Sequence, residues 1–415
     1  MAAAERFAAE SLPSVEEEVW RYSRIAELDL EGYELGTVPV PVPASALAPG
    51  HLRAALGTYP DHAAMVVVVN GVVAHAEVAP RWAAKGLVVG PLVELGGDES
   101  AIGSVLEEPT DVFALMNDAF SSAPVVVRVP DGLVLDQPVI VVNHLEGAGP
   151  ADRGSPGRTP AMFPRLVVQV GRDARAAVLD AYLGGAGAVL SVPVVELDVA
   201  RSGRLGYVNV QDLNLRSWQI ASQVARVDTE GSLVSACAGL GGDYARQRTD
   251  CKLVGRGATG ELLAVYFGEA DQTLDFRTFQ DHAAPDTTSN LLFKGAVGGR
   301  SRSVYTGLIR VRKNARGTNA FQTNRNVKLS DGAWAESVPN LEIENNDVHC
   351  SHASAVGPID EDQRFYLESR GLPPDVAERL VVGGFFREVL DQFPVPAAAP
   401  GLQAAVTDKF ERRES

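Results

Sequence analysis

The chain has 415 residues, of which 46% are hydrophobic and 22% are charged, and its formal net charge is −16. So acidic a protein is expected to repel nucleic acids and anionic membrane surfaces, and no apolar run reaches the roughly 20 residues that a membrane-spanning helix needs. The N-terminus carries acidic residues without a signal-peptide pattern, and the three cysteines are well separated. We therefore expect a cytoplasmic protein without disulfides.

Residues 1–60 are predicted to form an N-terminal helical region. Within it, the segment 14–28 has acidic residues in its first turns and apolar residues at helical spacing, which predicts a helix. A proline-rich connector follows at residues 39–50. The apolar positions of the predicted helix are Val15, Val19, Ile25 and Leu28.

Residues 64–355 are predicted to form a long, mainly β core domain. Short β-branched runs alternate with Gly, Asp and Asn turns, and almost no helical pattern interrupts them. The run 65–73 turns at Asn70-Gly71 and indicates a hairpin. A β-sandwich has about seven to nine strands in about 100 residues, so strands over this length favour a parallel β-helix. The pattern alone also allows a multi-sheet sandwich or several smaller β domains.

Residues 358–415 are predicted to form a C-terminal helical hairpin and a polar tail. Asp360 is a plausible N-cap for a first helix that stops at Gly371. A second helix has proline in its first turn and stops at Pro394. Two helices joined by so short a turn indicate an αα-hairpin.

The candidate site is the run His349-Cys350-Ser351-His352, at the end of the last predicted strand. Side chains alternate along a strand, so Cys350 and His352 share one face while His349 points to the other. Their Cα atoms should lie about 6.6 Å apart, so that both side chains can reach one soft metal. Two ligands leave a tetrahedral site incomplete, which suggests a half-site that a partner chain or a transient ligand completes. The alternative is a buried free cysteine beside a hydrogen-bonded histidine.

Other candidate motifs give weaker signals. Cys237 and Cys251 have apolar neighbours and are predicted to be core thiols. There is neither a Cys-x-x-Cys pair nor a Walker A motif, so we expect no self-contained iron–sulfur site and no ATP bound by this chain. The segment 290–330 carries many basic residues and no acidic ones. It is either a solvated sheet face or a surface that docks an acidic partner or an anion.

The last third of the chain carries a series of motifs at fixed spacing. They are Leu-Ser-Asp-Gly-Ala (329–333), Ser-Val-Pro-x-Leu-Glu-Ile (337–343), Cys-Ser-His (350–352), Asp-Glu-Asp-Gln-x-Phe-Tyr-Leu-x-Ser-Arg-Gly (360–371) and Gly-Phe-x-x-Glu-Val-Leu (384–390). With these motifs the chain resembles the SufB/SufD family of iron–sulfur cluster assembly proteins. The resemblance extends over most of the chain from about residue 200, and the segment 19–23 also resembles the family's Trp-Arg-Tyr segment. The Cys-Ser-His form at 350–352 is more similar to SufD than to SufB, although His349 stands where lysine is common and Ala353 where glycine is common.

This resemblance implies a right-handed parallel β-helix between helical ends, and a scaffold subunit rather than an enzyme. It implies pairing with a SufB paralogue and with the SufC ATPase, and a sulfur supply that comes indirectly from a cysteine-derived donor. An iron–sulfur cluster or iron would be held transiently and shared with the partner. Flavin binding and a homodimer of the isolated chain stay open.

The resemblance also implies roles for individual residues. His352 would be a ligand or proton-handling group with Cys350 beside it, and His349 could be a further ligand. Phe385, Phe386 and Leu390 would either face the ATPase or pack inside the hairpin. Two alternatives to the SufD-like scaffold remain, a SufB-type scaffold subunit and a β-helix polysaccharide lyase or hydrolase. The second would need paired carboxylates and stacking aromatic residues, a pattern that the sequence does not repeat.

Overall fold

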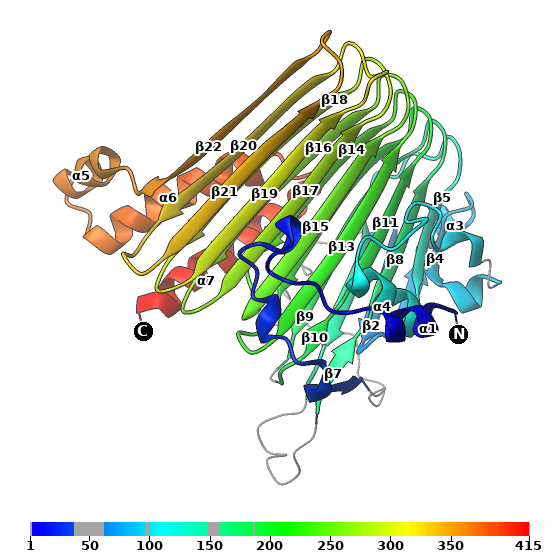
Figure 1. Ribbon diagram of the computed structural model, residues 1–415, viewed down its shortest axis with the longest axis horizontal. Helices are drawn as coiled ribbons and strands as arrows, with labels where there is room; N and C mark the ends of the chain where they lie inside the picture. Colours follow the sequence, from blue (N-terminus) through cyan, green and yellow to red (C-terminus); the bar gives the residue numbers. More distant parts are fainter. Residues whose placement is uncertain (1, 37–61, 97–98, 148–157, 186, 415) are drawn as a thin grey trace.

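The computed structural model describes residues 2–36, 62–96, 99–147, 158–185 and 187–414, and Figure 1 shows it as a long β-solenoid with helices at both ends. The solenoid has about seven turns. The parallel β-helix favoured by the sequence is thus confirmed, and the sandwich alternative is wrong. The predicted proline-rich connector at 39–50 lies outside the described residues.

Two long sheets face each other, and successive strands of the solenoid alternate between them. Sheet A contains β21 (Trp334–Ile343), β19 (Arg302–Val311), β17 (Thr273–His282), β15 (Tyr244–Leu253), β13 (Trp218–Val227), β11 (Val194–Val199), β8 (Arg165–Val170), β5 (Val125–Val129) and β4 (Val88–Pro91), joined at its border by β1 (Tyr33–Leu35), β7 (Thr159–Met162) and β10 (Leu190–Ser191). Sheet B contains β22 (His349–Pro358), β20 (Asn319–Lys328), β18 (Thr288–Val297), β16 (Thr259–Gly268), β14 (Ser232–Gly239), β12 (Arg204–Asp212), β9 (Arg175–Gly184), β6 (Val139–Leu145), β2 (Ala64–Val69) and β3 (Val72–Val78).

The register of the coils places like residues in rows inside the solenoid. Tyr244 pairs with Thr273 and Thr273 pairs with Arg302, so one coil advances the chain by 29 residues at this point. Because side chains alternate along each strand, every second residue faces the interior. One such row contains Val170, Val199, Val227 and Leu253, each at most 2% exposed.

A repeated turn at one border of the sheets explains why the sequence is rich in Gly and Asp between strands. Six successive turns place a residue in the left-handed region at equivalent positions. The backbone N–H of each donates to a carbonyl of the next turn, which builds a hydrogen-bonded ladder outside the strands. Glycine and aspartate tolerate this conformation better than branched residues do. The six residues are Asp173, Ser202, Glu230, Gly257, Asp286 and Gly317.

The N-terminal segment differs from the predicted helix at 14–28. After α1 (Ala2–Ala9), the chain forms short 3₁₀ turns, η1 (Glu18–Trp20), η2 (Ile25–Glu27) and η3 (Leu30–Gly32). Tyr22 has a φ of 64°, which a continuous helix excludes. The segment lies instead across the outer face of sheet A, where Arg246 donates to the Val19 carbonyl and Arg277 to the Arg21 carbonyl, both at 2.7 Å.

The structure contains the predicted C-terminal hairpin, but the prediction of a polar tail after it is wrong. The helix α5 (Glu361–Ser369) begins after Asp360, whose side chain caps two backbone N–H groups, and α6 (Pro374–Leu390) follows. The predicted tail is the helix α7 (Ala399–Glu414), which has buried residues that pack against sheet B. These residues are Leu402, Ala405, Val406 and Phe410. Two further helices were not predicted, α3 (Pro80–Ala83) and α4 (Val112–Phe120).

Candidate functional site

The two ends of the solenoid are built differently. At the N-terminal end the sheets finish with antiparallel strands, β3 beside β2 and β4 beside β5, and Trp82 of α3 is buried in the core there. At the other end, β21 and β22 are the last strands of their sheets. Each is ten residues long and, among the described residues, pairs on one side only. We call this second end the open end.

Cys350 and His352 lie on the inner face of the open end. Cys350 pairs with Ala320 and His352 with Gln322, and both of these β20 residues are 1% exposed inside the solenoid. Cys350 and His352 therefore continue two interior rows into the last coil, which confirms that they share a face of the strand. No further coil of the described residues covers them, so His352 is exposed and Cys350 is half-buried.

The surroundings of Cys350 are apolar on the side facing the protein. Its side chain packs against a buried apolar cluster that contains Ile309, Val311 and Ala320. Burial raises the pKa of the Cys350 thiol, and a hydrogen bond from the backbone of Ala320 partly offsets this. A thiol with a raised pKa is a weak nucleophile at neutral pH, and a bound metal would be needed to deprotonate it.

His349 is placed apart from this pair. It pairs with Asn319 on the exposed outer face of sheet B, so its side chain lies on the opposite side of β22 from His352. The structure thus brings together two of the three predicted ligands. Among the described residues, no group of three or more His, Cys, Asp or Glu side chains is placed to hold a metal ion.

The other two cysteines lie inside the solenoid, as predicted for core thiols. Cys251 is 1% exposed and faces the interior from β15. Cys237 is half-buried and packs against the same core from β14. Burial raises the pKa of each thiol to about 12, so neither is a ready nucleophile or metal ligand.

The basic segment 290–330 does not form one patch. Its strands alternate between the two sheets, so that Arg302 and Arg310 lie on sheet A whereas Lys294 and Arg325 lie on sheet B. Several of its basic side chains also pair with neighbouring carboxylates, as in Arg300–Asp271, Arg310–Glu344 and Arg312–Asp281. The solvated-face interpretation therefore fits most of the segment.

The α5–α6 hairpin projects beside β22, close to the open end (Figure 1). Phe386 and Leu390, two of the residues predicted to face a partner, are 1% and 3% exposed in the core between α6, α7 and sheet B. They pack inside the protein in this structure, which is the alternative that the sequence left open. Phe385 is partly buried and contacts the ammonium group of Lys294 at 4.4 Å.

Three exposed apolar side chains of the hairpin were missed from the sequence. Phe365 and Tyr366 of α5 are 72% and 58% exposed, and Leu380 of α6 is 51% exposed. Large apolar side chains that are exposed together often mark a protein contact. The signal available in the sequence was an aromatic pair on a short predicted helix. In the structure, this helix has no buried residue.

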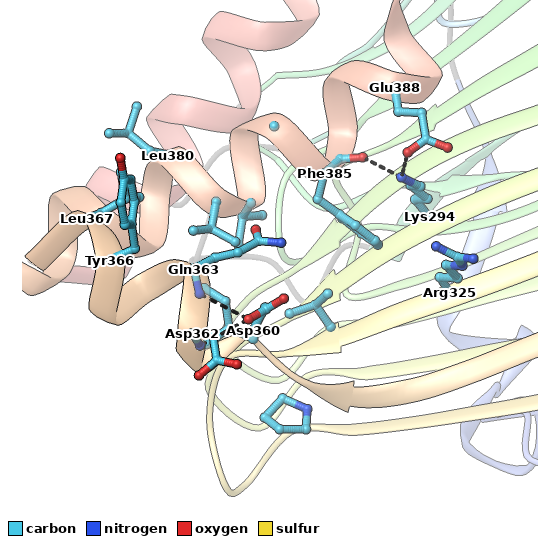
Figure 2. A pocket seen from close by; sticks show the side chains of 16 residues that line it. Lys294, Arg325, Asp360, Asp362, Gln363, Tyr366, Leu367, Leu380, Phe385 and Glu388 are labelled. Carbon is cyan, nitrogen blue, oxygen red and sulfur yellow. Dashed lines mark hydrogen bonds and ion pairs between the residues drawn. The ribbon is translucent and has the colours of Figure 1, made fainter.

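A cleft of about 1000 Å³ lies between this hairpin and the outer face of sheet B (Figure 2). Arg325 and Val327 of β20 line one side, and Tyr366, Leu380 and Phe385 line the other. Lys294 lies at the inner end of the cleft, where it donates to the Phe385 carbonyl at 3.0 Å and to Glu388 at 2.6 Å. The Arg325 guanidinium lies close to Lys294 (Figure 2).

Comparison with known proteins identifies the family. Residues 153–385 match the model of the SufBD core domain of the SUF system for FeS cluster assembly. An iron–sulfur cluster assembly SufBD family protein of Mycobacterium tuberculosis is 36% identical over 316 residues, which are 74% of this chain and 76% of that protein. A Mycobacterium leprae protein of the same description is 33% identical over 74% of this chain and 77% of its own length. The chloroplastic protein ABCI7 of Arabidopsis thaliana is 28% identical over 79% of this chain and 70% of its own length. The chain therefore belongs to the SufBD family of iron–sulfur cluster assembly proteins.

Proposed function

We propose that this chain is the SufD-like, non-enzymatic subunit of an assembly scaffold and that its open end joins a SufB paralogue. The observation that carries the proposal is the position of Cys350 and His352 on the inner face of the last, uncovered coil. A terminal repeat of a solenoid normally needs a cap, and the N-terminal end has one. Two ten-residue edge strands without a second neighbour in the described structure are a template for pairing with another chain.

The partner would complete the ligand set of the site. Cys350 and His352 supply one sulfur and one nitrogen, whereas an iron–sulfur cluster is usually held by four protein ligands. A SufB paralogue stacked on β21 and β22 would place its own end strands beside this pair. An iron–sulfur cluster or iron would then be a shared, transient cargo rather than a resident cofactor of this chain.

The ATPase would dock on the hairpin. Phe365, Tyr366 and Leu380 form the exposed apolar surface for it, in place of the buried Phe386 and Leu390. Motion of the ATPase would then reach the open end through sheet B, because α6 contacts β16 and β18 directly.

The test is reconstitution of the complex from this chain, the SufB paralogue and the SufC ATPase. We expect His352→Ala to abolish cluster assembly while leaving the three subunits together. The matched control is His349→Ala, on the outer face of the same strand, which should assemble clusters normally. Full cluster yield from His352→Ala would refute the site.

A second variant tests the pairing surface separately. His349 donates its backbone N–H to Thr318, so the N–H groups of the alternate residues 350, 352 and 354 point to the unpaired edge. Ser354→Pro removes one of these edge donors without breaking the ladder to β20. We expect it to prevent co-purification with the paralogue while the chain stays folded, and retained pairing would contradict the proposed interface.

A further inference from the structure

The two halves of α6 are held very differently. In α5 no side chain is buried, and in α6 before the pair Gly383-Gly384 only Ala377 and Val382 are buried. After the glycine pair the helix is fixed to the core, because Phe386, Val389 and Leu390 are each at most 3% exposed. The hairpin therefore consists of a loosely held outer part and an anchored inner part.

The anchored part is fixed by a buried cation as well as by packing. The Lys294 side chain is 3% exposed, and its ammonium group contacts the Phe385 carbonyl, the Glu388 carboxylate and the Phe385 ring. Lys294 belongs to β18, so this contact attaches the second half of α6 directly to sheet B.

Gly383 and Gly384 lie at the junction of the two parts. A Cβ atom added to either glycine would meet no atom within 4 Å, so no close packing requires glycine there. Each glycine inside a helix weakens the helix about fivefold relative to alanine. Pairs of small residues that include glycine are also common positions of helix kinks. What the pair contributes is therefore backbone freedom and not space for a neighbour.

The outer part has room to move. The cleft of about 1000 Å³ separates it from β20, and the side chains around this cleft come from both the outer part of the hairpin and sheet B (Figure 2). Rotation at the junction would carry Tyr366 and Leu380 toward or away from Arg325 and Val327. The anchored half of α6 would not need to leave its packing.

We propose that Gly383–Gly384 is a hinge on which α5 and the first half of α6 swing as a unit against sheet B. This inference rests on the proposed docking of an ATPase on the hairpin. It adds that the part of the hairpin on which the ATPase docks can move relative to sheet B. The hinge opens and closes the cleft, and the anchored half of α6 transmits the resulting force to β18.

The test is the double variant Gly383→Ala/Gly384→Ala. Each change favours the straight helix about fivefold, so the pair should disfavour bent conformers about 25-fold. Spin labels on Ser369→Cys and Asn290→Cys, in a Cys350→Ser background, would report the distance from α5 to β18 in the isolated chain. We expect a broad distance distribution with the native glycines and a narrow one with the alanines.

The second readout is ATP-driven cluster assembly with native cysteines. The alanine pair should bind the ATPase as the native chain does and yet assemble clusters at least several-fold more slowly. Arg387→Ala, an exposed change in the anchored half, is the control and should behave as the native chain. A narrow distribution with the native glycines, or unimpaired assembly by the alanine pair, would overturn the hinge. Failure of the native chain to bind the ATPase would instead refute the proposed function, and the distance measurement would still decide the hinge.

Discussion

Lys294 offers a direct test of how the hairpin is attached to sheet B. We consider two substitutions, Lys294→Met and Lys294→Ala. Methionine keeps an unbranched side chain of similar length and removes only the ammonium group. Alanine removes the ammonium group and the buried aliphatic stem as well. The comparison therefore separates the contribution of the charge from that of the packing.

The structure favours packing as the larger contribution. Glu388 is 59% exposed, so its ion pair with Lys294 is screened by solvent and should contribute about 0–1 kcal/mol. Removing a buried ammonium group also removes its desolvation cost. Loss of three buried methylene groups costs about 0.8 kcal/mol each, or about 2.4 kcal/mol before any cavity is counted. We therefore expect Lys294→Met to cost about 1 kcal/mol or less and Lys294→Ala about 3 kcal/mol.

Hydrogen exchange of the α6 amides measures these costs locally, since the hairpin can open without unfolding of the solenoid. The pKa of Glu388 is an independent readout. The hydrogen bond from Lys294 is the main cause that holds that pKa below its usual range, so either substitution should raise it. If Lys294→Met increases exchange in residues 385–390 as much as Lys294→Ala does, the ammonium contacts dominate and the packing argument is wrong.

Three further predictions concern the solenoid. Burial raises the pKa of Asp180 to about 7, so the stability that this protonated carboxyl contributes is lost as the pH rises from about 4 through 7. Asp180→Asn should therefore flatten that part of a profile of unfolding free energy against pH. A profile identical to that of the native chain would contradict this prediction. Burial raises the pKa of Cys237 and Cys251 to about 12, so at mildly alkaline pH an alkylating reagent should modify Cys350 first and the other two thiols much more slowly until the protein unfolds; mass spectrometry that finds all three thiols modified at one rate before unfolding would disprove the assignment. Trp20→Ala removes a buried ring whose centroid lies 3.8 Å from the buried guanidinium group of Arg246. The change should lower the free energy of unfolding by about 3–5 kcal/mol and make the N-terminal segment accessible to proteases. An unchanged melting temperature would argue against this anchoring.

The sequence predicted the solenoid because its signals are local. Alternating side chains and a turn residue such as Asp286 or Gly317 appear once in each coil, and each can be read from a few neighbouring positions. The segment 14–28 was predicted wrongly because its conformation depends on distant partners. Arg246 and Arg277, more than 200 positions later, bind its carbonyl groups and hold it in short turns.

The candidate site shows the same division. Strand alternation alone predicted that Cys350 and His352 share a face and that His349 does not. Their exposure could not be predicted, because it depends on β22 being the last strand of its sheet. The hairpin is a second example, since the family resemblance pointed to Phe386 but did not reveal that sheet B covers it.

The positions of the hairpin and the site in sheet B set the route by which they could be coupled. The anchored half of α6 contacts β18, β18 pairs with β20, and β20 pairs with β22. Two strand spacings of about 4.8 Å separate Lys294 from the strand that carries His352. A displacement of β18 would reach the site through β20, where Ala320 and Gln322 flank Cys350 and His352 in register. Coupling between the two ends of this route requires an element with two states. The hinge that we propose at the glycine junction of α6 would be this element at the hairpin end. Its motion would alter the contact with a partner at the edge of β22, where the described residues provide no second neighbouring strand.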